Sequence, residues 1–364
     1  MNILLTASYK NGIFCNGLQQ NIVFLAELFK DIGFDPIIAI DHSIDECKDP
    51  PTNILIVEKH EIIEYCKNLH AVFHSSWDID KKIIDELKIK FPNFKNIHVH
   101  YGNRLLADIE QSSWDKTVPI TPYRVDEVWV SPHYKFSIPY FKTYYKSQKV
   151  FELPYIWSPK YIMKHEEIWN KADKSCFYNK NDEKNIGIFE PNLNITKHCI
   201  PSIMIVEELY SKEKSLFNAL NVYCTSRLKD ANYFKKLMWG LDIQKDNKVN
   251  YKPRQIVSKS LSSESNISLS NQLLNGLNYT YLEALYFNLP LVHNSKYIKS
   301  AGYYYPEYDI QKGAECLRLA LTYHDRNIDE YKKQSQIILN RYSPENPLVI
   351  AEYKKLLSWE LELH

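Results

Sequence analysis

Short apolar runs alternate with longer segments of helical periodicity over almost the whole chain. The first run, NILLTA, is followed by a polar loop and a helical pattern from Leu18 to Ile32, with Gly33 as its C-cap. The apolar run PIIAID comes next and completes a β-loop-α-β unit. Strands that alternate with helices in this way are typical of a parallel sheet covered by helices, so the predicted fold class is α/β.

The same alternation continues to about residue 160. Helical patterns lie at about 60–69 and 78–90, and an aromatic-rich helix is predicted between the last two strands. The further strand candidates of this part are NILIVE (53–58), AVFHSS (71–76), NIHVHYG (96–102), DEVWVSP (126–132) and KVFELPYIW (149–157). Together these segments predict one doubly wound domain.

A polar, turn-rich stretch at 172–184, ADKSCFYNKNDEK, is the predicted linker, and the alternation restarts after it. The segments of this second part are strands NIGIFEP (185–191), ALNVYCTS (219–226) and SNISLSNQ (265–272), and helices at about 196–210, 230–239, 313–324, 328–340 and 346–362. The stretch GLNYTYLEALYFNLPLVHNS (276–295) adds a helix and a strand. We therefore predict domains at 1–170 and 184–344, and a C-terminal helix at 345–364 that returns to the first domain.

Composition places the chain among globular proteins. Of its 364 residues, 45% are hydrophobic and 24% are charged, and the formal net charge of +1 gives no electrostatic reason to expect a nucleic-acid partner. The seven cysteines show no CxxC spacing, which indicates reduced thiols rather than a zinc site. Neither a signal peptide nor a membrane span is expected, so we predict a cytoplasmic protein.

Candidate chemistry lies in the loops that follow the strands, because open α/β sheets bind ligands beyond the carboxyl ends of their strands. In the second domain these loops carry Glu190, Asn192, Asn194, Lys197, Ser226, Arg227, Asn275, Asn278, Tyr279 and Thr280. Lys197 and Arg227, close to predicted helix N-termini, are suited to a pyrophosphate. The alternative is that both are solvated surface residues, as most Lys and Arg are.

Glu283 is the one carboxylate in the apolar helix of 276–295, and it is predicted near the helix start. An acid at this place is stabilised by the helix dipole, and it also suits a ribose diol, because a carboxylate accepts two hydrogen bonds. The residues alone leave both interpretations open.

The segment NGLNYTYLEALYFNLPLVHNS resembles the nucleotide-sugar signature of GT-B glycosyltransferases. Retaining families of that class carry two glutamates eight positions apart, and the second binds the ribose. Glu283 matches the second glutamate, whereas the first falls on Asn275, which carries no charge. Lys197 in NIGIFEPNLNITK matches the family's phosphate-binding lysine, and Arg227 matches its arginine loosely. The resemblance is sharp over 271–306.

A second resemblance adds to this one. LNYTYLEALYFNLPLVHNS together with AGYYYP is similar to an uncharacterised, GT-B-like family of bacterial and giant-virus proteins. Both resemblances imply two Rossmann-like domains that face a central cleft. They also imply a hexosyltransferase-like enzyme without a metal or cofactor, whose donor is a nucleotide-diphosphate sugar of the UDP or GDP type. The expected partner is a carbohydrate or glycoconjugate acceptor, and the resemblance leaves the oligomeric state open.

The first domain is then expected to bind the acceptor. Its candidate groups are Asn11, Gly12, Asn16 and Gln19 in the first loop, His74 to Trp77, and His100 to Arg104. His100 is a candidate general base because its ordinary pKa is near 6.5, and Asp78 is a second candidate. The alternative for each histidine is a structural or surface role.

Two further features have ordinary explanations. Asp78-Ile79-Asp80 has the spacing of an Asp-x-Asp metal motif, but it is predicted to cap a helix, and we predict no metal. The stretch 131–149 mixes lysines with aromatic residues, which is compatible with a peripheral membrane contact, or with a helix whose lysines are solvated.

The leading hypothesis is therefore a glycosyltransferase that transfers a sugar from a nucleotide-diphosphate sugar to an acceptor hydroxyl. One alternative is a catalytically silent GT-B-like module that binds nucleotide or sugar, which the neutral Asn275 motivates. The other is an unrelated two-domain α/β binding protein.

Overall fold

The computed structural model describes residues 1–364 except 11, 15–16, 49, 52, 114–120, 122, 165–174 and 359–364, and except the side chains of 262 and 263. Two compact units make up the chain. The first unit contains Met1–Trp157 and Tyr342–His364, and the second contains Ser158–Arg341. The predicted linker at 172–184 lies partly outside the described residues.

A parallel sheet of seven strands, ordered β3-β2-β1-β4-β5-β6-β7, forms the centre of the first unit. Its strands are β1 (Asn2–Ala7), β2 (Asp35–Ile40), β3 (Leu55–Glu58), β4 (Leu69–His74), β5 (Lys95–His100), β6 (Glu127–Val130) and β7 (Val150–Glu152). Its helices are α1 (Gly17–Asp31), α2 (Ile62–Tyr65), α3 (Lys81–Lys90), α4 (Arg104–Ser113), α5 (Ile138–Tyr144) and α14 (Pro347–Leu356), with 3-10 turns at Ile44–Glu46, Lys59–Glu61 and Pro132–Ser137. The sheet is parallel because each strand is followed by a crossover, as the alternation predicted.

A second parallel sheet, of six strands ordered β10-β9-β8-β11-β12-β13, forms the centre of the other unit. Its strands are β8 (Asn185–Ile188), β9 (Ala219–Val222), β10 (Val249–Tyr251), β11 (Ile267–Leu269), β12 (Leu291–His293) and β13 (Tyr303–Tyr304). Its helices are α7 (Cys199–Tyr210), α8 (Asn232–Trp239), α9 (Asp242–Lys245), α10 (Val257–Ser263), α11 (Tyr279–Tyr286), α12 (Ile310–Thr322) and α13 (Ile328–Arg341), with 3-10 turns at Lys296–Ile298 and His324–Arg326. This strand order, 3-2-1-4-5-6 within the unit, is that of a Rossmann sheet.

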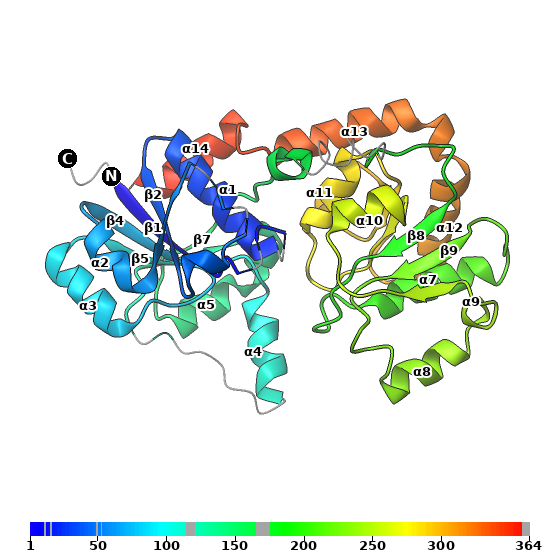
Figure 1. The fold of residues 1–364 in the computed structure, drawn as a ribbon, viewed down its shortest axis with the longest axis horizontal. Coiled ribbons are helices and arrows are strands. Elements are labelled where there is room, and N and C mark those ends of the chain that lie inside the picture. Colours follow the sequence, from blue (N-terminus) through cyan, green and yellow to red (C-terminus); the bar gives the residue numbers. More distant parts are fainter. Residues whose placement is uncertain are drawn as a thin grey trace. The chain divides into compact units, whose positions relative to one another are not determined.

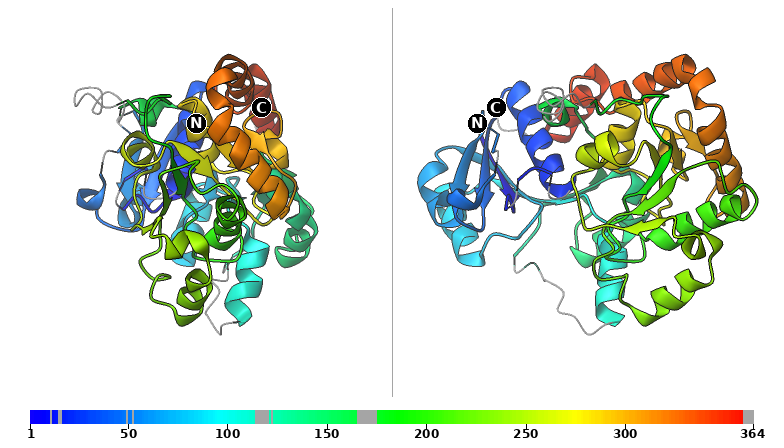
Figure 2. Two further views of the ribbon diagram at one scale, coloured as in Figure 1. Left: turned by 90° about the vertical axis from the view of Figure 1, so that its right-hand side faces the viewer. Right: turned by 45° about the vertical axis from the view of Figure 1, so that its right-hand side comes forward.

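Helices cover both faces of each sheet (Figures 1 and 2), so the strands are buried on both sides. Ile186, Ile188 and Leu220 are fully buried in the second unit, as are Ile3 and Leu4 in the first. Parallel strands in such a layer read as continuous apolar runs, which is why short stretches such as NILLTA were recognisable in the sequence.

The C-terminal helix returns to the first unit, as predicted. In α14 the hydroxyl of Tyr353 donates a hydrogen bond of 2.7 Å to the carbonyl of Pro154, and its ring packs edge-on against Phe29. Tyr353 is fully buried, so this contact adds apolar area to the core as well as a hydrogen bond. The predicted span 346–362 runs into residues outside the described part of the chain.

Several sequence-based elements are corrected. The helix predicted at 60–69 is only a 3-10 turn followed by the four-residue α2, and the helix predicted from 78 begins at Lys81. The short strands β10 and β13 were not predicted, because two or three residues carry no measurable periodicity. Pairing with β9 and with β12 determines them.

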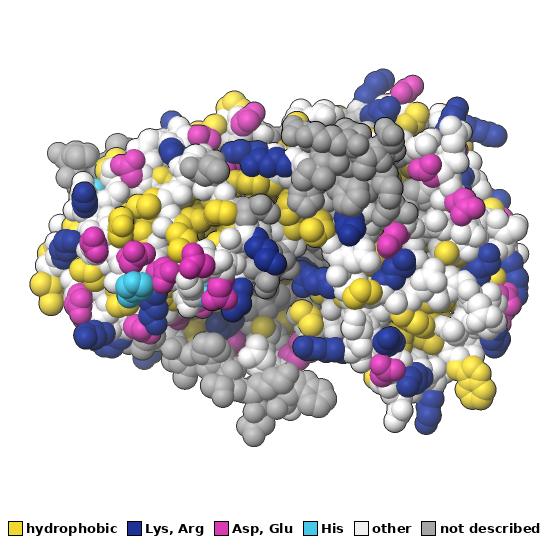
Figure 3. Space-filling view, viewed as in Figure 1, with side chains coloured by type: hydrophobic (Ala, Val, Ile, Leu, Met, Phe, Trp, Pro, Cys, Tyr) yellow, Lys and Arg dark blue, Asp and Glu magenta, His cyan; other side chains and the backbone are white. Residues whose placement is uncertain are grey.

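The distribution of surface charges and the state of the cysteines fit the near-neutral net charge and the cysteine spacing of the sequence. On the face of the first unit that Figure 3 shows, acidic and basic side chains are interspersed. Each cysteine that the structure describes is a free thiol. Among the described residues, no helix combines the length and the apolar character needed to cross a membrane.

Candidate functional site

The strand order reverses between β8 and β11 of the second unit, and the loops after these two strands meet there. Lys197 and Gln272 form an isolated antiparallel bridge between the loops, and the amide of Leu273 donates to the carbonyl of Thr196 at 2.9 Å. Such a reversal point is the usual ligand-binding place of an open α/β sheet. The predicted loops are therefore brought together at the expected edge.

Glu190 lies buried between these loops, immediately after β8. Its carboxylate accepts a hydrogen bond from the Ser270 hydroxyl and another, of 3.0 Å, from the amide of Gln272. Burial raises the pKa of Glu190 to about 7, and the hydrogen bonds and Lys197 only partly oppose that rise. Near neutral pH this carboxyl group is therefore divided between its charged and neutral forms.

Lys197 is half-buried directly before α7 and faces two charges of opposite sign. Burial lowers the pKa of its ammonium, Glu190 raises it, and Arg254 lowers it again. Arg254 is an exposed residue just after β10, and it lies near enough to Lys197 for its positive charge to destabilise the charged form of that lysine. Sequence reasoning did not select Arg254, because β10 itself was missed. Arg227 is exposed in the loop after β9.

Asn192 has a structural task within the first loop. Its backbone is left-handed, with φ of 55°, and its side-chain oxygen accepts from the Cys199 amide at 2.8 Å at the start of α7. Its amide donates to the carbonyl of Glu190 at 3.0 Å. The Asn192 side chain therefore orients this loop and the N-terminus of α7.

The second loop leads into α11. The buried side chain of Asn275 donates to the side-chain oxygen of Gln272, which links it to Glu190. Asn278 is the N-cap of α11, where its side-chain oxygen accepts from the amide of Thr280 at 3.2 Å. Tyr279 is buried and Thr280 is half-buried beside it. These predicted residues form the loop and the start of α11 beside the point where the strand order reverses, called here the switch point.

Close packing of this loop depends on a glycine. A Cβ atom at Gly276 would lie 2.6 Å from the ring of Tyr297, closer than any real contact. The Ser295 hydroxyl also donates to the carbonyl of Gly276. Glycine at 276 thus lets the loop before α11 approach the segment after β12.

Glu283 lies in the second turn of α11 and is only 4% exposed. Among the described residues no group donates a hydrogen bond to its carboxylate. Burial alone raises the pKa of Glu283 to about 7, without a contribution from a neighbouring charge. The carboxylate of Glu283 is thus poorly solvated and is held by none of the described side chains, so it is available to a ligand.

Three histidines share one face of the first sheet. His74, at the end of β4, lies opposite His98 of β5, and their rings stack at 4.9 Å. His100 is two residues further along β5, so it lies on the same face. The hydroxyl of Tyr145 is 3.2 Å from both His98 Nδ1 and His100 Nε2. Parallel pairing thus builds a cluster that spacing alone did not predict.

The two predicted general bases differ in their surroundings. His100 stacks on Phe141 at 4.3 Å, and burial, followed by Arg104, lowers its pKa to about 3. Asp78 accepts a hydrogen bond of 2.8 Å from the Thr121 hydroxyl and lies 3.5 Å from His98. An imidazole with so low a pKa is a weak base, because efficient general bases have pKa values near the working pH.

The two aspartates of the Asp-x-Asp motif contact different partners and do not form one metal-binding pair. Asp80 occupies the N-cap position of α3 without a side-chain capping hydrogen bond, and it pairs with Lys59 at 2.5 Å. Asp78 turns instead toward His98. The capping role expected for this motif is therefore positional only.

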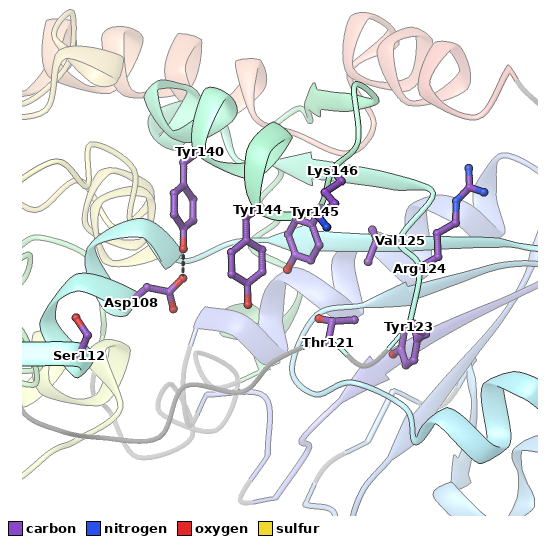
Figure 4. A pocket seen from close by; sticks show the side chains of 10 residues that line it. All are labelled: Asp108, Ser112, Thr121, Tyr123, Arg124, Val125, Tyr140, Tyr144, Tyr145 and Lys146. Carbon is purple, nitrogen blue, oxygen red and sulfur yellow. Dashed lines mark hydrogen bonds between the residues drawn. The ribbon is translucent and has the colours of Figure 1, made fainter.

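A cavity of about 640 Å³ lies within the first unit, next to the histidine cluster. It is lined by Asp108, Ser112, Thr121, Tyr123, Arg124, Val125, Tyr140, Tyr144, Tyr145 and Lys146 (Figure 4). The hydroxyl of Tyr140 donates to Asp108 at 2.6 Å, and Arg104 holds the other oxygen of that carboxylate at 2.5 Å. Aromatic walls with one fixed carboxylate are suited to a ligand with both apolar faces and hydroxyl groups.

The first loop contributes less. Gly12 has φ of 84°, and the buried Gln19 donates its amide to the carbonyl of Ser8. Asn11 and Asn16 lie outside the described residues. In the His74 to Trp77 segment, the Trp77 indole donates to the carbonyl of Ala7 at 3.1 Å, which ties it to β1.

Comparison with known families gives a match over nearly the whole chain. The family described as "Protein of unknown function (DUF2827)" matches residues 3–357. The chain belongs to this family. No protein with a curated description matches the DUF2827 chain in sequence.

Solved structures share the fold at low sequence identity. An alpha-glucosyltransferase in complex with UDP and a 13-mer DNA has a TM-score of 0.63 at 12% identity, over 98% of this chain and 99% of that one. The pneumococcal O-GlcNAc transferase GtfA, in complex with UDP and GlcNAc, has 0.60 at 11%, over 99% of each chain. A glycosyltransferase from Rickettsia africae has 0.56 at 16%, over 98% of each. The DUF2827 chain thus has the fold of GT-B glycosyltransferases, as predicted.

Proposed function

We propose that the protein is a glycosyltransferase that transfers a sugar from a nucleotide-diphosphate sugar, of the UDP or GDP type, to an acceptor hydroxyl. The GT-B fold supports this proposal, and two solved relatives in fold contain UDP. The observation that carries it is Glu283, a buried carboxylate without a described partner on the helix that follows the switch point of the second unit.

Glu283 binds the ribose in this proposal. Its pKa is raised by burial alone, so no neighbouring cation is available to hold a phosphate there. A carboxylate isolated from cations suits a neutral diol, whose two hydroxyl groups donate hydrogen bonds to it. The ligand would then supply the hydrogen bonds that the described part of the protein does not.

Lys197 and Arg254 neutralise the pyrophosphate in this proposal. Lys197 precedes the N-terminus of α7, where the helix dipole also favours an anion. Arg254 lowers the pKa of Lys197, so the two cations repel each other, and Glu190 is the nearby carboxyl group that opposes this repulsion. A bound pyrophosphate relieves that repulsion, so donor binding requires no metal ion.

The acceptor, a carbohydrate or glycoconjugate, binds to the first unit in this proposal. The cavity beside Tyr140, Tyr144 and Tyr145 supports this role, because tyrosine rings offer apolar faces and their hydroxyl groups bind sugar hydroxyls. His100 and Asp78 stay predictions for the base that activates the acceptor.

Calorimetric binding of UDP and GDP, with and without EDTA, tests the donor site. We expect one of them to bind with a dissociation constant that EDTA does not change. Arg254→Gln should weaken binding about tenfold, about 1.4 kcal/mol, whereas the control Arg326→Gln, at an exposed arginine in the 3-10 turn His324–Arg326, should leave it unchanged. Arg227→Gln tests the arginine that the family resemblance suggested. Failure of both nucleotides to bind would refute the proposal and favour an unrelated α/β binding protein.

Turnover separates the enzyme from a silent module. A purified sample is incubated with UDP- and GDP-sugars, and release of free nucleotide is measured over time. We expect slow hydrolysis of one donor, which an acceptor accelerates. Nucleotide binding without release from any donor would instead identify a silent binding module.

A further inference from the structure

Three side chains able to bind a metal ion converge on one point of the first unit. They are His74, Asp78 and His98, and one ligand atom from each lies within 4.8 Å of the others. The sheet register sets His74 opposite His98, and the loop after β4 brings Asp78 back over them. Two imidazoles and one carboxylate form the donor set of zinc and non-haem iron sites.

The spacing of two of these atoms fits a metal better than a hydrogen bond. His98 Nε2 and Asp78 Oδ1 are 3.5 Å apart, and His98 Nε2 is buried without a hydrogen-bond partner among the described residues. Zinc binds nitrogen and oxygen at about 2.0–2.2 Å, so two tetrahedral ligand atoms lie about 3.4 Å apart. The pair is therefore already separated as an edge of such a tetrahedron.

Other side chains hold each ligand in place. Tyr145 contacts His98 Nδ1 at 3.2 Å, Tyr123 contacts His74 Nδ1 at 3.0 Å, and Thr121 donates to the second oxygen of Asp78 at 2.8 Å. Outer contacts of this kind orient metal ligands and fix the tautomer of each imidazole. They leave His98 Nε2 and Asp78 Oδ1 for the shared point. His74 Nε2 lies 3.4 Å from both Asn96 Oδ1 and the Tyr123 hydroxyl, and an ion would replace these long contacts when His74 supplies the third ligand atom.

We propose that His74, Asp78 and His98 bind a divalent transition-metal ion of the zinc class in the first unit. The side chain of Asp78 is 30% exposed, which gives an ion access, and three protein ligands leave a fourth position for water or a ligand. This assignment removes Asp78 from the candidate general bases. It is independent of the donor site, which is built from the second unit.

Metal content of the full-length protein tests the proposal. The protein is stripped with EDTA, dialysed, and titrated with Zn²⁺ and with Co²⁺ as a spectroscopic probe. We expect about one ion per chain, a Co²⁺ absorption spectrum of a tetrahedral site, and a higher melting temperature with Zn²⁺. Wild-type protein that binds neither ion stoichiometrically would overturn the proposal.

Matched variants locate the site. His98→Gln should abolish stoichiometric binding, whereas His100→Gln, two residues along the same strand face, should retain it. If His98→Gln does not fold, Asp78→Asn keeps the shape of the side chain and should likewise lose the ion. Thr121→Val removes only an outer contact, so affinity should fall by about 10- to 100-fold. Equal loss in His100→Gln and His98→Gln would refute the assignment.

Discussion

Replacing Glu283 by glutamine separates the cost of a buried carboxylate from its use in binding. The glutamine side chain keeps the size and one acceptor of the original, but it has no proton to lose. In the wild type, burial raises the pKa of Glu283 from 4.5 to about 7. Because the folded state holds this proton more tightly than the unfolded state, wild-type stability falls as pH rises from about 4.5 to about 7.

The magnitude follows from the same two pKa values. Between pH 5 and pH 8, linkage gives a loss of about 2–3 kcal/mol from Glu283. The Glu283→Gln variant lacks this loss, so its stability relative to wild type should rise by that amount over this interval. Glu190, whose pKa is raised in the same direction, affects both proteins alike and cancels. For a unit of this size, the change corresponds to roughly 5–10 °C in melting temperature.

Two measurements on the same pair of proteins provide the assay. Melting temperatures are recorded at pH 5, 6, 7 and 8 without ligand, and nucleotide affinity is measured by calorimetry at pH 6 and 8. Glu283→Gln should be the more stable protein at pH 8 and should bind nucleotide about tenfold more weakly there. The affinity ratio should shrink at pH 6, because the wild-type carboxylate is then mostly protonated.

Two results would contradict these expectations. A stability difference that does not change with pH would mean that the carboxylate is solvated or paired. Equal nucleotide affinity of the two proteins at pH 8 would remove Glu283 from the ribose site, even if the stability result agrees with expectation.

Two further predictions concern the loops that carry the donor site. Asn192→Ala should lower stability by about 2–3 kcal/mol, because it removes the hydrogen bonds of the Asn192 side chain and leaves alanine in a left-handed conformation. Asn192→Gly, which relieves the backbone, should cost less in the same thermal-shift assay. Gly276→Ala should cost about 1–3 kcal/mol because its methyl group meets the Tyr297 ring, and Tyr297→Ala in the same chain should recover part of that loss; equal melting temperatures of Gly276→Ala and wild type would show that the loop yields.

Local patterns were sufficient for much of the fold. Each apolar run long enough to span a buried strand was recognised, and the helices around 196–210 and 276–290 were placed within a few residues. Glu283 was found because an acid inside an apolar helix stands out in one dimension. These features depend on neighbours in sequence, which is the information that periodicity contains.

Other features depend on residues that are distant in sequence. Arg254 joins Lys197 only because β10 pairs with β9, and His74 meets His98 only through the register of β4 and β5. The role of Asn192 depends on its left-handed backbone conformation, which the hydrophobic pattern of the sequence does not predict.

The sequence by itself determined that the chain alternates strands with helices, that the sheets are parallel, and which loops follow the strands. Only the tertiary structure decided the strand order, the convergence of His74, Asp78 and His98, and the absence of a described partner for the Glu283 carboxylate. The physical reason is that the burial of a strand or helix face follows from the spacing of apolar residues along the chain. The distances between charged groups and between metal ligands depend instead on the crossovers and the strand register, which bring distant segments together.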